Sequence, residues 1–454
     1  MGAYRTLDFV INDILMAVKP QQQDWVTRFH IIDELRKVIE SVESLRGATV
    51  EPFGSFVSNL FTRQGDLDIS VQLPNGSYIS AAGKKLKQTL LGDLLKALRQ
   101  TGGWRRLQFI AHARVPILKI ESKYTSISCD ISIDNLHGYI KSKFLFWISE
   151  IDGRFREMIL LVKEWAKCHD INNPKTGSFN SFALCLLVIF HFQTCAPAIL
   201  PPLRDIYPCS AVDDLQGVRA DAERRIAETC AANIARFKSS ISRPNRSSLS
   251  ELFISFLAKF LGLNLKAPEF GICPYTGQWE EIRNNMRWMP QTYALFIEDP
   301  FEQPENTARA VSARQLKRIS EAFEVTHHRL TSYSQNQPAV LAALVRPHEV
   351  QFLTRTPVRN GNYNGGRPNM TPWNQRALNS PSQMQHQHRR MKNNRQGPAQ
   401  SFTHNSAVPP KPHQHPSNDS TPQTPSEQHQ NKPRQMWKPR SSSGIVDGEG
   451  CQVG

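Results

Sequence analysis

The sequence predicts an α/β (α+β) protein with a mixed sheet, followed by a helical region and a polar tail. Apolar residues recur with helical period from Asp24 to Glu43 and again from Leu86 to Leu98. Short alternating runs rich in β-branched residues lie on both sides of the second stripe, and such runs favour strands. Downstream of Asp134 the apolar period changes to that of helices. We therefore expect helices packed on a sheet, and then a helical domain.

The composition divides the chain into four parts. Residues 1–45 are expected to form N-terminal helices that pack on the helical domain, residues 46–138 the sheet domain, and residues 139–334 the helical domain. From residue 335 to residue 454, Gln, Asn, His, Pro, Ser and Arg dominate. This composition buries too little apolar surface to offset the entropy of the chain, so we expect residues 335–454 to be a disordered basic tail.

Charge favours a polyanionic partner. The 454 residues carry a formal net charge of +15, and the segment from Arg355 to the C-terminus holds 13 basic and four acidic residues, so +9 lies in the tail and +6 in the rest. Lysines and arginines that release counterions from a phosphate backbone supply sequence-independent affinity for nucleic acid. Trp373 and Trp437 stand among arginines, as stacking groups do in single-strand binders. A solvated linker or a protein-docking tail fits the same composition.

The sequence gives no sign of secretion or of a membrane span. The eight cysteines have no spacing typical of a zinc site, which favours reduced thiols. The N-terminus lacks the apolar core of a signal peptide, and the longest apolar run, Phe182 to Phe192, is too short to cross a bilayer. We expect a cytoplasmic protein, a nuclear protein or both, with Arg389 to Lys392 as a weak nuclear-import candidate.

Three aspartates form the main candidate site. Asp66 and Asp68 are one residue apart in an apolar alternating run, so on a strand both carboxylates leave the same face. Asp130 lies in a second alternating run that is able to pair beside the first. Carboxylates gathered in this way favour Mg²⁺, and three of them suit a pair of metal ions. Gly54 and Ser55, just upstream, are suited to phosphate contacts.

These motifs carry a family resemblance. Gly54-Ser55, Asp66-x-Asp68 and the later Asp130 resemble the catalytic signature of DNA polymerase β-like nucleotidyltransferases. Within them the chain is similar to noncanonical poly(A) polymerases and terminal uridylyltransferases, in particular to the plant small-RNA uridylyltransferase type. The resemblance covers roughly residues 20–325 in family order. Further matching segments are Leu161 to Lys167, Asn180 to Phe182, and Ile297 to Phe301.

The resemblance implies a fold, an activity and partners. It implies a nucleotidyltransferase palm in the sheet domain and a poly(A)-polymerase-associated central domain in the helical part. The implied enzyme adds uridines from UTP to RNA 3′ ends without a template, and so promotes turnover of small RNAs or RNA fragments. Mg²⁺, with Mn²⁺ as a substitute, is the implied cofactor, and RNA-silencing proteins are candidate partners of the tail. The alternatives are a poly(A) polymerase that uses ATP and a catalytically silent RNA-binding scaffold.

The resemblance also assigns roles to residues in the helical domain. It implies that Lys163, Lys167 and Ser181, with Gly54 and Ser55, hold the triphosphate. Lys163 and Lys167 are four residues apart on one helical face, where a solvated face is the alternative. Phe182 is expected to stack on the base, or else to be a core residue. Asn135 is carried over as a contact to the ribose or to the metal shell.

The segment Ile297 to Asn306 is the family's base-recognition segment, and the name is kept below. The resemblance makes Asp299 its acidic anchor, whereas local sequence suits an N-cap for a helix from Ala308 to Phe323. Glu305 stands where several uridylyltransferases have histidine, and its carboxylate is able to accept from uracil N3–H or from the amino group of adenine. Lys141 replaces an asparagine that contacts the ribose in the family.

Overall fold

A computed structural model describes residues 5–74, 79, 82–211, 213–288, 292–332 and 337–346. In the first half of the chain the elements are α1 (Arg5–Val18), α2 (Gln22–Glu40), η1 (Glu43–Leu45), β1 (Thr49–Phe53), α3 (Gly54–Val57), β2 (Leu67–Gln72), α4 (Lys84–Thr101), β3 (Trp104–Ile110), β4 (Ile117–Ser122), β5 (Ser128–Ile133), α5 (Leu136–Ser149) and α6 (Gly153–Cys168). The later elements are η2 (Pro174–Thr176), α7 (Ser181–Thr194), α8 (Leu203–Ile206), α9 (Arg219–Ser240), α10 (Leu249–Lys259), α11 (Leu263–Lys266), β6 (Phe270–Cys273), β7 (Gln278–Glu281), η3 (Ile282–Asn284), α12 (Ala313–Thr331) and α13 (Gln337–Leu344).

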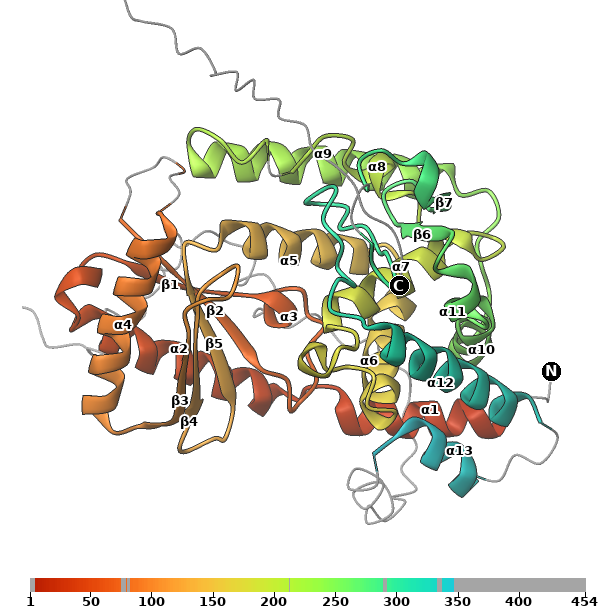
Figure 1. The fold of residues 1–454 in the computed structure, drawn as a ribbon, viewed down its shortest axis with the longest axis horizontal. Helices are drawn as coiled ribbons and strands as arrows, with labels where there is room; N and C mark the ends of the chain where they lie inside the picture. Colours follow the sequence, from red (N-terminus) through yellow and green to blue (C-terminus); the bar gives the residue numbers. More distant parts are fainter. Residues whose placement is uncertain are drawn as a thin grey trace, which may run out of the picture. The chain divides into compact units, whose positions relative to one another are not determined.

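The mixed sheet predicted from the sequence is confirmed. Five strands lie in the order β1-β2-β5-β4-β3, and β2 and β5 run parallel while the other neighbours are antiparallel (Figure 1). The parallel pair needs a long crossover, and α4 with β3 and β4 supplies it. This order puts β2 beside β5, the two strands that carry candidate aspartates. A separate two-stranded sheet, β6 with β7, lies in the helical part of the sequence.

Helices α2 and α4 pack on the five-stranded sheet. Ile31, Ile32 and Leu35 from α2 share one core with Leu91 and Leu94 from α4 and with the apolar residues of the strands. The prediction that residues 1–45 pack as a unit on the helical domain is therefore wrong for α2. Its apolar stripe matches the sheet, whereas the turn at Lys19 and Pro20 separates it from α1.

Helix α1 belongs to the second core, which the helices after β5 build. Leu7, Val10 and Ile14 of α1 lie in this core, and α1 contacts α6, α10 and α13 (Figure 1). The central helix α7 is apolar on all sides and buried on all sides, as a helix inside a large core must be.

The helical domain continues beyond residue 334, where the sequence suggested that it ends. Val340, Leu341 and Leu344 of α13 are buried in the helical core. Arg346 just after α13 forms an ion pair with Glu164 of α6, with Nε 2.9 Å from Oε1. The apolar run there was too short to stand out from the polar residues around it. The rest of the predicted tail, residues 347–454, lies outside the described residues.

Helix α9 packs on the helical core and reaches the sheet through its first residue. It contacts α5 and α8, and Figure 1 shows it running along α5. Arg219 at its start pairs with Glu51 of β1, with Nη2 2.7 Å from Oε2, and with Glu223 one helical turn later. Arg219 therefore attaches the start of α9 to the edge strand of the sheet. None of the described helices is long and apolar enough to cross a bilayer.

Candidate active site

Asp68, Asp130 and Lys119 form a row across three neighbouring strands. Asp68 of β2 is the register partner of Asp130 of β5, and Asp130 is the partner of Lys119 of β4. Register partners point to the same face of a sheet, so these side chains leave the same face. Asp66 comes just before β2. Its turn is held by Arg28 of α2, whose Nη2 donates to the carbonyl of Gly65 at 2.5 Å.

The Gly-Ser turn lies directly against the carboxylate of Asp68. Phe53, the last residue of β1, is the register partner of Asp68, and Gly54 follows it with φ +66°. A Cβ atom at Gly54 would lie 1.9 Å from Oδ2 of Asp68, so no other residue fits without moving the carboxylate. The amide of Gly54 donates to Oγ of Ser142 in α5 at 2.7 Å. Helix α5 therefore holds the glycine in place.

The carboxylates of the row lie close enough to repel one another and to shift a pKa. Burial, followed by the charges of Asp130 and Asp66, raises the pKa of Asp68 from its ordinary value to about 7. Nζ of Lys119 lies 2.8 Å from Oδ1 of Asp130 and 3.5 Å from Oδ2 of Asp66, and so offsets part of the negative charge. Among the described residues, Lys119 is the one whose cation forms an ion pair with Asp66 and with Asp130.

Asp66, Asp68 and Asp130, called the carboxylate site below, have the donor chemistry of a divalent-cation site. Hard cations such as Mg²⁺ take carboxylate oxygens. Oδ1 of Asp130 is buried, and its partner is the ammonium of Lys119 at 2.8 Å. As the side chains stand, no three Asp, Glu, His or Cys groups in the described part of the chain converge closely enough to hold a metal ion. The chemistry of their oxygen donors fits the ion, while Lys119 engages Asp66 and Asp130.

The two candidate lysines of α6 have different surroundings. Lys163 is 7% exposed, and its Nζ donates to the carbonyl of Leu60 at 2.8 Å, so it holds the loop that follows α3. Lys167 is half-buried, and its ammonium has no hydrogen bond or ion pair with a described residue. Burial lowers the pKa of Lys167, while the charge of Glu164 opposes that change. Lys167 is the one of the two that remains available for a phosphate.

The remaining candidates near the phosphates lie at helix starts. Ser55 lies in the first turn of α3 and Ser181 is the first residue of α7. Oγ of Ser181 lies 3.3 Å from Oδ1 of Asn172. Asn135 is the N-cap of α5, and its Oδ1 accepts from the amide of Gly138 at 3.1 Å. Its side-chain oxygen therefore has a structural role, beside the nucleotide role that the resemblance implied.

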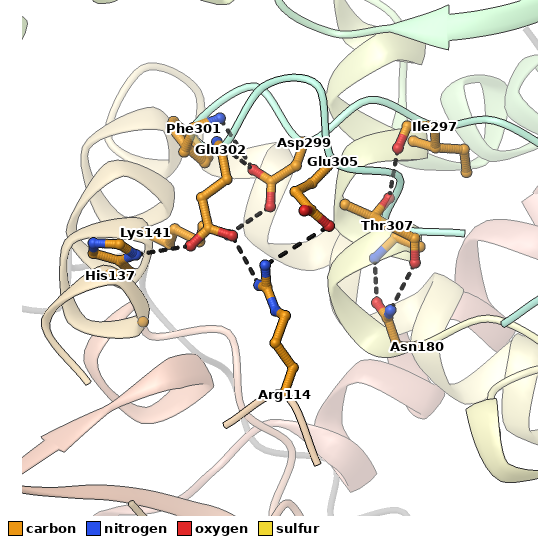
Figure 2. A network of polar contacts seen from close by, with 12 residues as sticks. Arg114, His137, Lys141, Asn180, Ile297, Asp299, Phe301, Glu302, Glu305 and Thr307 are labelled. Carbon is orange, nitrogen blue, oxygen red and sulfur yellow. Dashed lines mark hydrogen bonds and ion pairs between the residues drawn. The ribbon is translucent and has the colours of Figure 1, made fainter. Parts of the chain in front are cut away.

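Phe182 is partly buried at the start of α7, against the helical core. Nζ of Lys141 lies 5.4 Å from the centre of its ring, and the ring of Phe301 is tilted against it at 6.4 Å. Asn180, just before Phe182, donates to the carbonyl of Thr307 at 2.8 Å (Figure 2). Helix α7 and the base-recognition segment are thus fixed to one another.

Asp299 does not cap a helix, which corrects one of its two sequence interpretations. The next long helix is α12, 14 residues later, and its N-cap is Ser312. Instead, Oδ1 of Asp299 accepts from the amides of Phe301 and Glu302, and Oδ2 pairs with Nζ of Lys141 at 2.5 Å (Figure 2). The aspartate therefore shapes its own turn and anchors it to α5.

Glu302 is the centre of the polar network in Figure 2. Its side chain is 12% exposed and contacts Arg114 at 2.8 Å, His137 at 3.1 Å and Lys141 at 3.3 Å. Burial alone would raise the pKa of Glu302, but the hydrogen bond from His137 and the charges of Lys141 and Arg114 outweigh it and lower the pKa. Arg114 comes from the turn between β3 and β4, so the network joins the palm to the base-recognition segment.

Glu305 is less constrained than Glu302. Its side chain is 45% exposed, and Oε2 lies 3.0 Å from Nη1 of Arg309 and 3.7 Å from Nη1 of Arg114. The carboxylate predicted to accept from uracil is therefore shared between two arginines.

Sequence reasoning missed five residues that support the site: Arg28, Arg114, Lys119, Ser142 and Glu302. Only Lys119 had a usable signal, because a charge within an apolar alternating strand must lie on the face opposite the core. The others act through the contacts of Arg28 with Gly65, Ser142 with Gly54 and Arg114 with Glu302, which join positions 37 or more residues apart and which no local pattern specifies.

Comparison with known families agrees with this geometry. Residues 7–150 match the model for "Poly(A) RNA polymerase, mitochondrial-like, central palm domain". Among curated proteins, Protein HESO1 of Arabidopsis thaliana is 63% identical over 351 residues, which are 77% of this chain and 68% of that protein. Poly(A) RNA polymerase GLD2 of Bos taurus is 27% identical over 289 residues, 61% of this chain and 55% of that protein.

The fold is also that of a solved structure. The Cid1 poly(U) polymerase with MgGTP bound matches with a TM-score of 0.58 and 22% identity, over 75% of this chain and 99% of that one.

Proposed function

The chain belongs to the noncanonical poly(A) polymerase and terminal uridylyltransferase family of DNA polymerase β-like nucleotidyltransferases, and is of the plant small-RNA uridylyltransferase type. From this membership, we propose that it is an RNA terminal uridylyltransferase, which adds uridines from UTP to RNA 3′ ends without a template. The row of Asp68 and Asp130 beside Gly54 is the observation that carries the proposal. These residues form a carboxylate site, and the backbone turn at Gly54 lies in contact with the carboxylate of Asp68.

The chemistry of the site follows from its charges. Asp66, Asp68 and Asp130 would hold divalent cations, Mg²⁺ or Mn²⁺, which when bound lower the pKa of the RNA 3′-hydroxyl and stabilise charge on the departing pyrophosphate. The protein's own part is positioning. The buried strands β2 and β5 fix the spacing of Asp68 and Asp130, and Arg28 fixes the turn of Asp66. No side chain is required as general base.

The triphosphate contacts are assigned to Lys167, Ser55, Ser181 and Gly54, and Ser181 would exchange its present contact with Asn172 for a phosphate oxygen. Lys167 contributes an ammonium without a partner among the described residues, and Ser55 and Ser181 contribute hydroxyls at helix starts. Gly54 contributes close backbone approach. Lys163 acts indirectly in this proposal, since its ammonium holds the carbonyl of Leu60.

For the base, we assign stacking to Phe182 and hydrogen bonding to groups around it. Lys141 is the cation nearest its ring, and lysine offers donors only. Uracil presents a carbonyl oxygen where the exocyclic group of adenine is an amino donor, so a lysine donor directed at the exocyclic group favours UTP, although adenine also has ring-nitrogen acceptors. Asp299 holds Lys141, and Glu305 remains a proposed acceptor for uracil N3–H. Asn135 remains a proposed contact to the ribose through its amide nitrogen.

Two alternatives are open to the same test. Relatives named as poly(A) RNA polymerases favour ATP as the competing nucleotide. A catalytically silent scaffold would be expected to have lost a metal ligand, and all three aspartates are present.

The experiment is to incubate the full chain with end-labelled single-stranded RNA and one NTP at a time, in Mg²⁺ or in Mn²⁺. We expect extension with UTP that exceeds extension with ATP. RNA with a blocked 3′-hydroxyl is the matched control and should not be extended. Extension by ATP alone would support the poly(A) polymerase alternative, and no extension by any NTP would support the scaffold.

A further inference from the structure

Lys119 occupies the position where a cation is required. Its ammonium lies 2.8 Å from Oδ1 of Asp130 and 3.5 Å from Oδ2 of Asp66, and its side chain is 31% exposed. Lys119 is also the register partner of Asp130 on the neighbouring strand. The strand backbone thus delivers a positive charge directly to the carboxylate site, without any contribution from a flexible loop.

The contact with Asp130 is a charged pair at hydrogen-bonding distance. Nζ of Lys119 lies 2.8 Å from Oδ1 of Asp130, and this oxygen is buried. A divalent cation carries twice the charge of an ammonium group and attracts the same oxygen more strongly. In the free protein, the lysine therefore engages an oxygen that a metal ion would also use.

Loss of this positive charge would leave three carboxylates close together. Like charges held on one face repel, and the repulsion is strongest where burial limits solvent screening. With Lys119 present, the carboxylates of Asp66 and Asp130 are directed toward the ammonium, and no three acidic groups among the described residues converge on a common point. Convergence on a metal ion requires the ammonium to leave.

From these contacts, we propose that Lys119 is a positioning residue that competes with the divalent cation for Asp66 and Asp130. The inference rests on the proposed function, since it concerns the cation that the three aspartates would hold. The lysine neutralises the site in the free enzyme and lowers its affinity for metal ions alone. A nucleotide brings phosphate oxygens that attract the displaced ammonium, so metal and nucleotide bind together more tightly than metal alone.

The size of the effect follows from the fraction of molecules in which the ammonium has left. If that fraction is about one tenth, the apparent dissociation constant for a free metal ion is raised about tenfold. Removal of the ammonium should restore the intrinsic affinity and should also lower the stability of the metal-free protein.

The test is a titration of Mn²⁺ alone into the full chain, followed by electron paramagnetic resonance of the free ion, with thermal melting in EDTA and in Mn²⁺. Lys119→Met should bind Mn²⁺ at least about tenfold more tightly than wild type. Its melting temperature in EDTA should be lower than that of wild type, and Mn²⁺ should raise its melting temperature by more than it raises that of wild type. If Lys119→Met does not fold, Lys119→Gln, which keeps a polar side chain, takes its place and should also bind Mn²⁺ more tightly than wild type.

The matched control is Lys123→Met, which removes one exposed positive charge from the same β4–β5 hairpin. It should leave both Mn²⁺ affinity and melting unchanged. Equal or weaker Mn²⁺ binding by the Lys119 variants would overturn the inference. Failure of wild type to bind Mn²⁺ even with UTP would instead contradict the proposed metal site, so the two failures are distinguishable.

Discussion

The carboxylate site and the base-recognition segment are held by different kinds of interaction. The carboxylate site stands on neighbouring strands, where register alone puts Asp68 beside Asp130. The base-recognition segment has little regular structure and is held by a polar network. In this network Glu302 contacts Arg114, His137 and Lys141. A strand-built site tolerates few changes of shape, whereas a network of side chains is able to change its contacts. We therefore expect the geometry of the carboxylate site to be rigid, and the contacts that select the base to be adjustable.

The largest expected effect concerns the helical core on which the base-recognition segment rests. Removal of residues 335–454 deletes α13 and leaves Glu164, which is 1% exposed, without Arg346. Loss of one partner of a buried ion pair costs about 3–5 kcal/mol, and the lost apolar packing adds to it. We expect the free energy of unfolding, measured by urea denaturation, to fall by at least about 4 kcal/mol.

Removal of residues 355–454 is the matched control, because it keeps α13 and Arg346. We expect unchanged stability but weaker RNA binding with a smaller dependence on salt, since the deleted part carries +9. Equal losses of stability for both truncations would show that α13 contributes nothing to the helical core.

The next effect tests the rigidity of the carboxylate site. Gly54→Ala puts a methyl group 1.9 Å from the present position of Asp68 Oδ2, at a φ of +66° that disfavours alanine. The carboxylate must move without being removed, and displacement of a catalytic group by about 1 Å costs roughly 100-fold in rate. We expect kcat for uridine addition to fall by at least about 100-fold.

Gly92→Ala is the control for Gly54→Ala. Gly92 lies inside α4, and no atom outside its own helix lies within 4 Å of the place that an alanine methyl group would take. Alanine there should keep full activity and raise stability by up to about 1 kcal/mol. Full activity of Gly54→Ala would mean that the glycine turn does not constrain Asp68.

A smaller effect is expected in the base-recognition segment. Glu302→Gln keeps the shape of the side chain but removes the charge shared by Arg114, His137 and Lys141. We expect a loss of about 2–3 kcal/mol in the free energy of unfolding at pH 7. Glu305→Gln, on a half-exposed side chain, should cost less than about 1 kcal/mol.

The pH dependence gives an independent check on Glu302. Its folded-state pKa is lowered, so its contribution is fully present above the ordinary glutamate pKa and is lost as the pH falls through the folded value. Wild type should therefore lose more stability than Glu302→Gln on acidification below about pH 5. Parallel stability profiles for the two proteins would show that the ion pairs of Glu302 contribute nothing.

The same contrast explains how much the sequence was able to predict. Asp66, Asp68 and Asp130 were found because strand period and alternation are local properties of the chain. Parallel pairing of β2 with β5 then brought Asp68 and Asp130 to one place. The family resemblance supplied the base-recognition segment, but not its contacts. Glu302 and Arg114 are 188 residues apart, and nothing in either neighbourhood specifies the other.

The errors have the same cause. Asp299 looked like a helix cap because Asp-Pro is a local signal, whereas its partner Lys141 is 158 residues away. The sequence places α2 on the helical core, whereas it packs on the sheet, because an apolar stripe does not specify the core against which it packs. The sequence predicts that the helical domain ends at residue 334, because α13 is only eight residues long.

The most direct test of the account is the ratio of kcat/KM for UTP to that for ATP in two variants, each assayed at a temperature where it is folded. Asp68→Asn should lower both values by the same factor, because it acts on the chemistry. Lys141→Met should lower the UTP to ATP ratio by at least about tenfold, because a donor beside the ring of Phe182 is lost. If Lys141→Met lowers both values equally and leaves the ratio unchanged, the polar network does not choose the base.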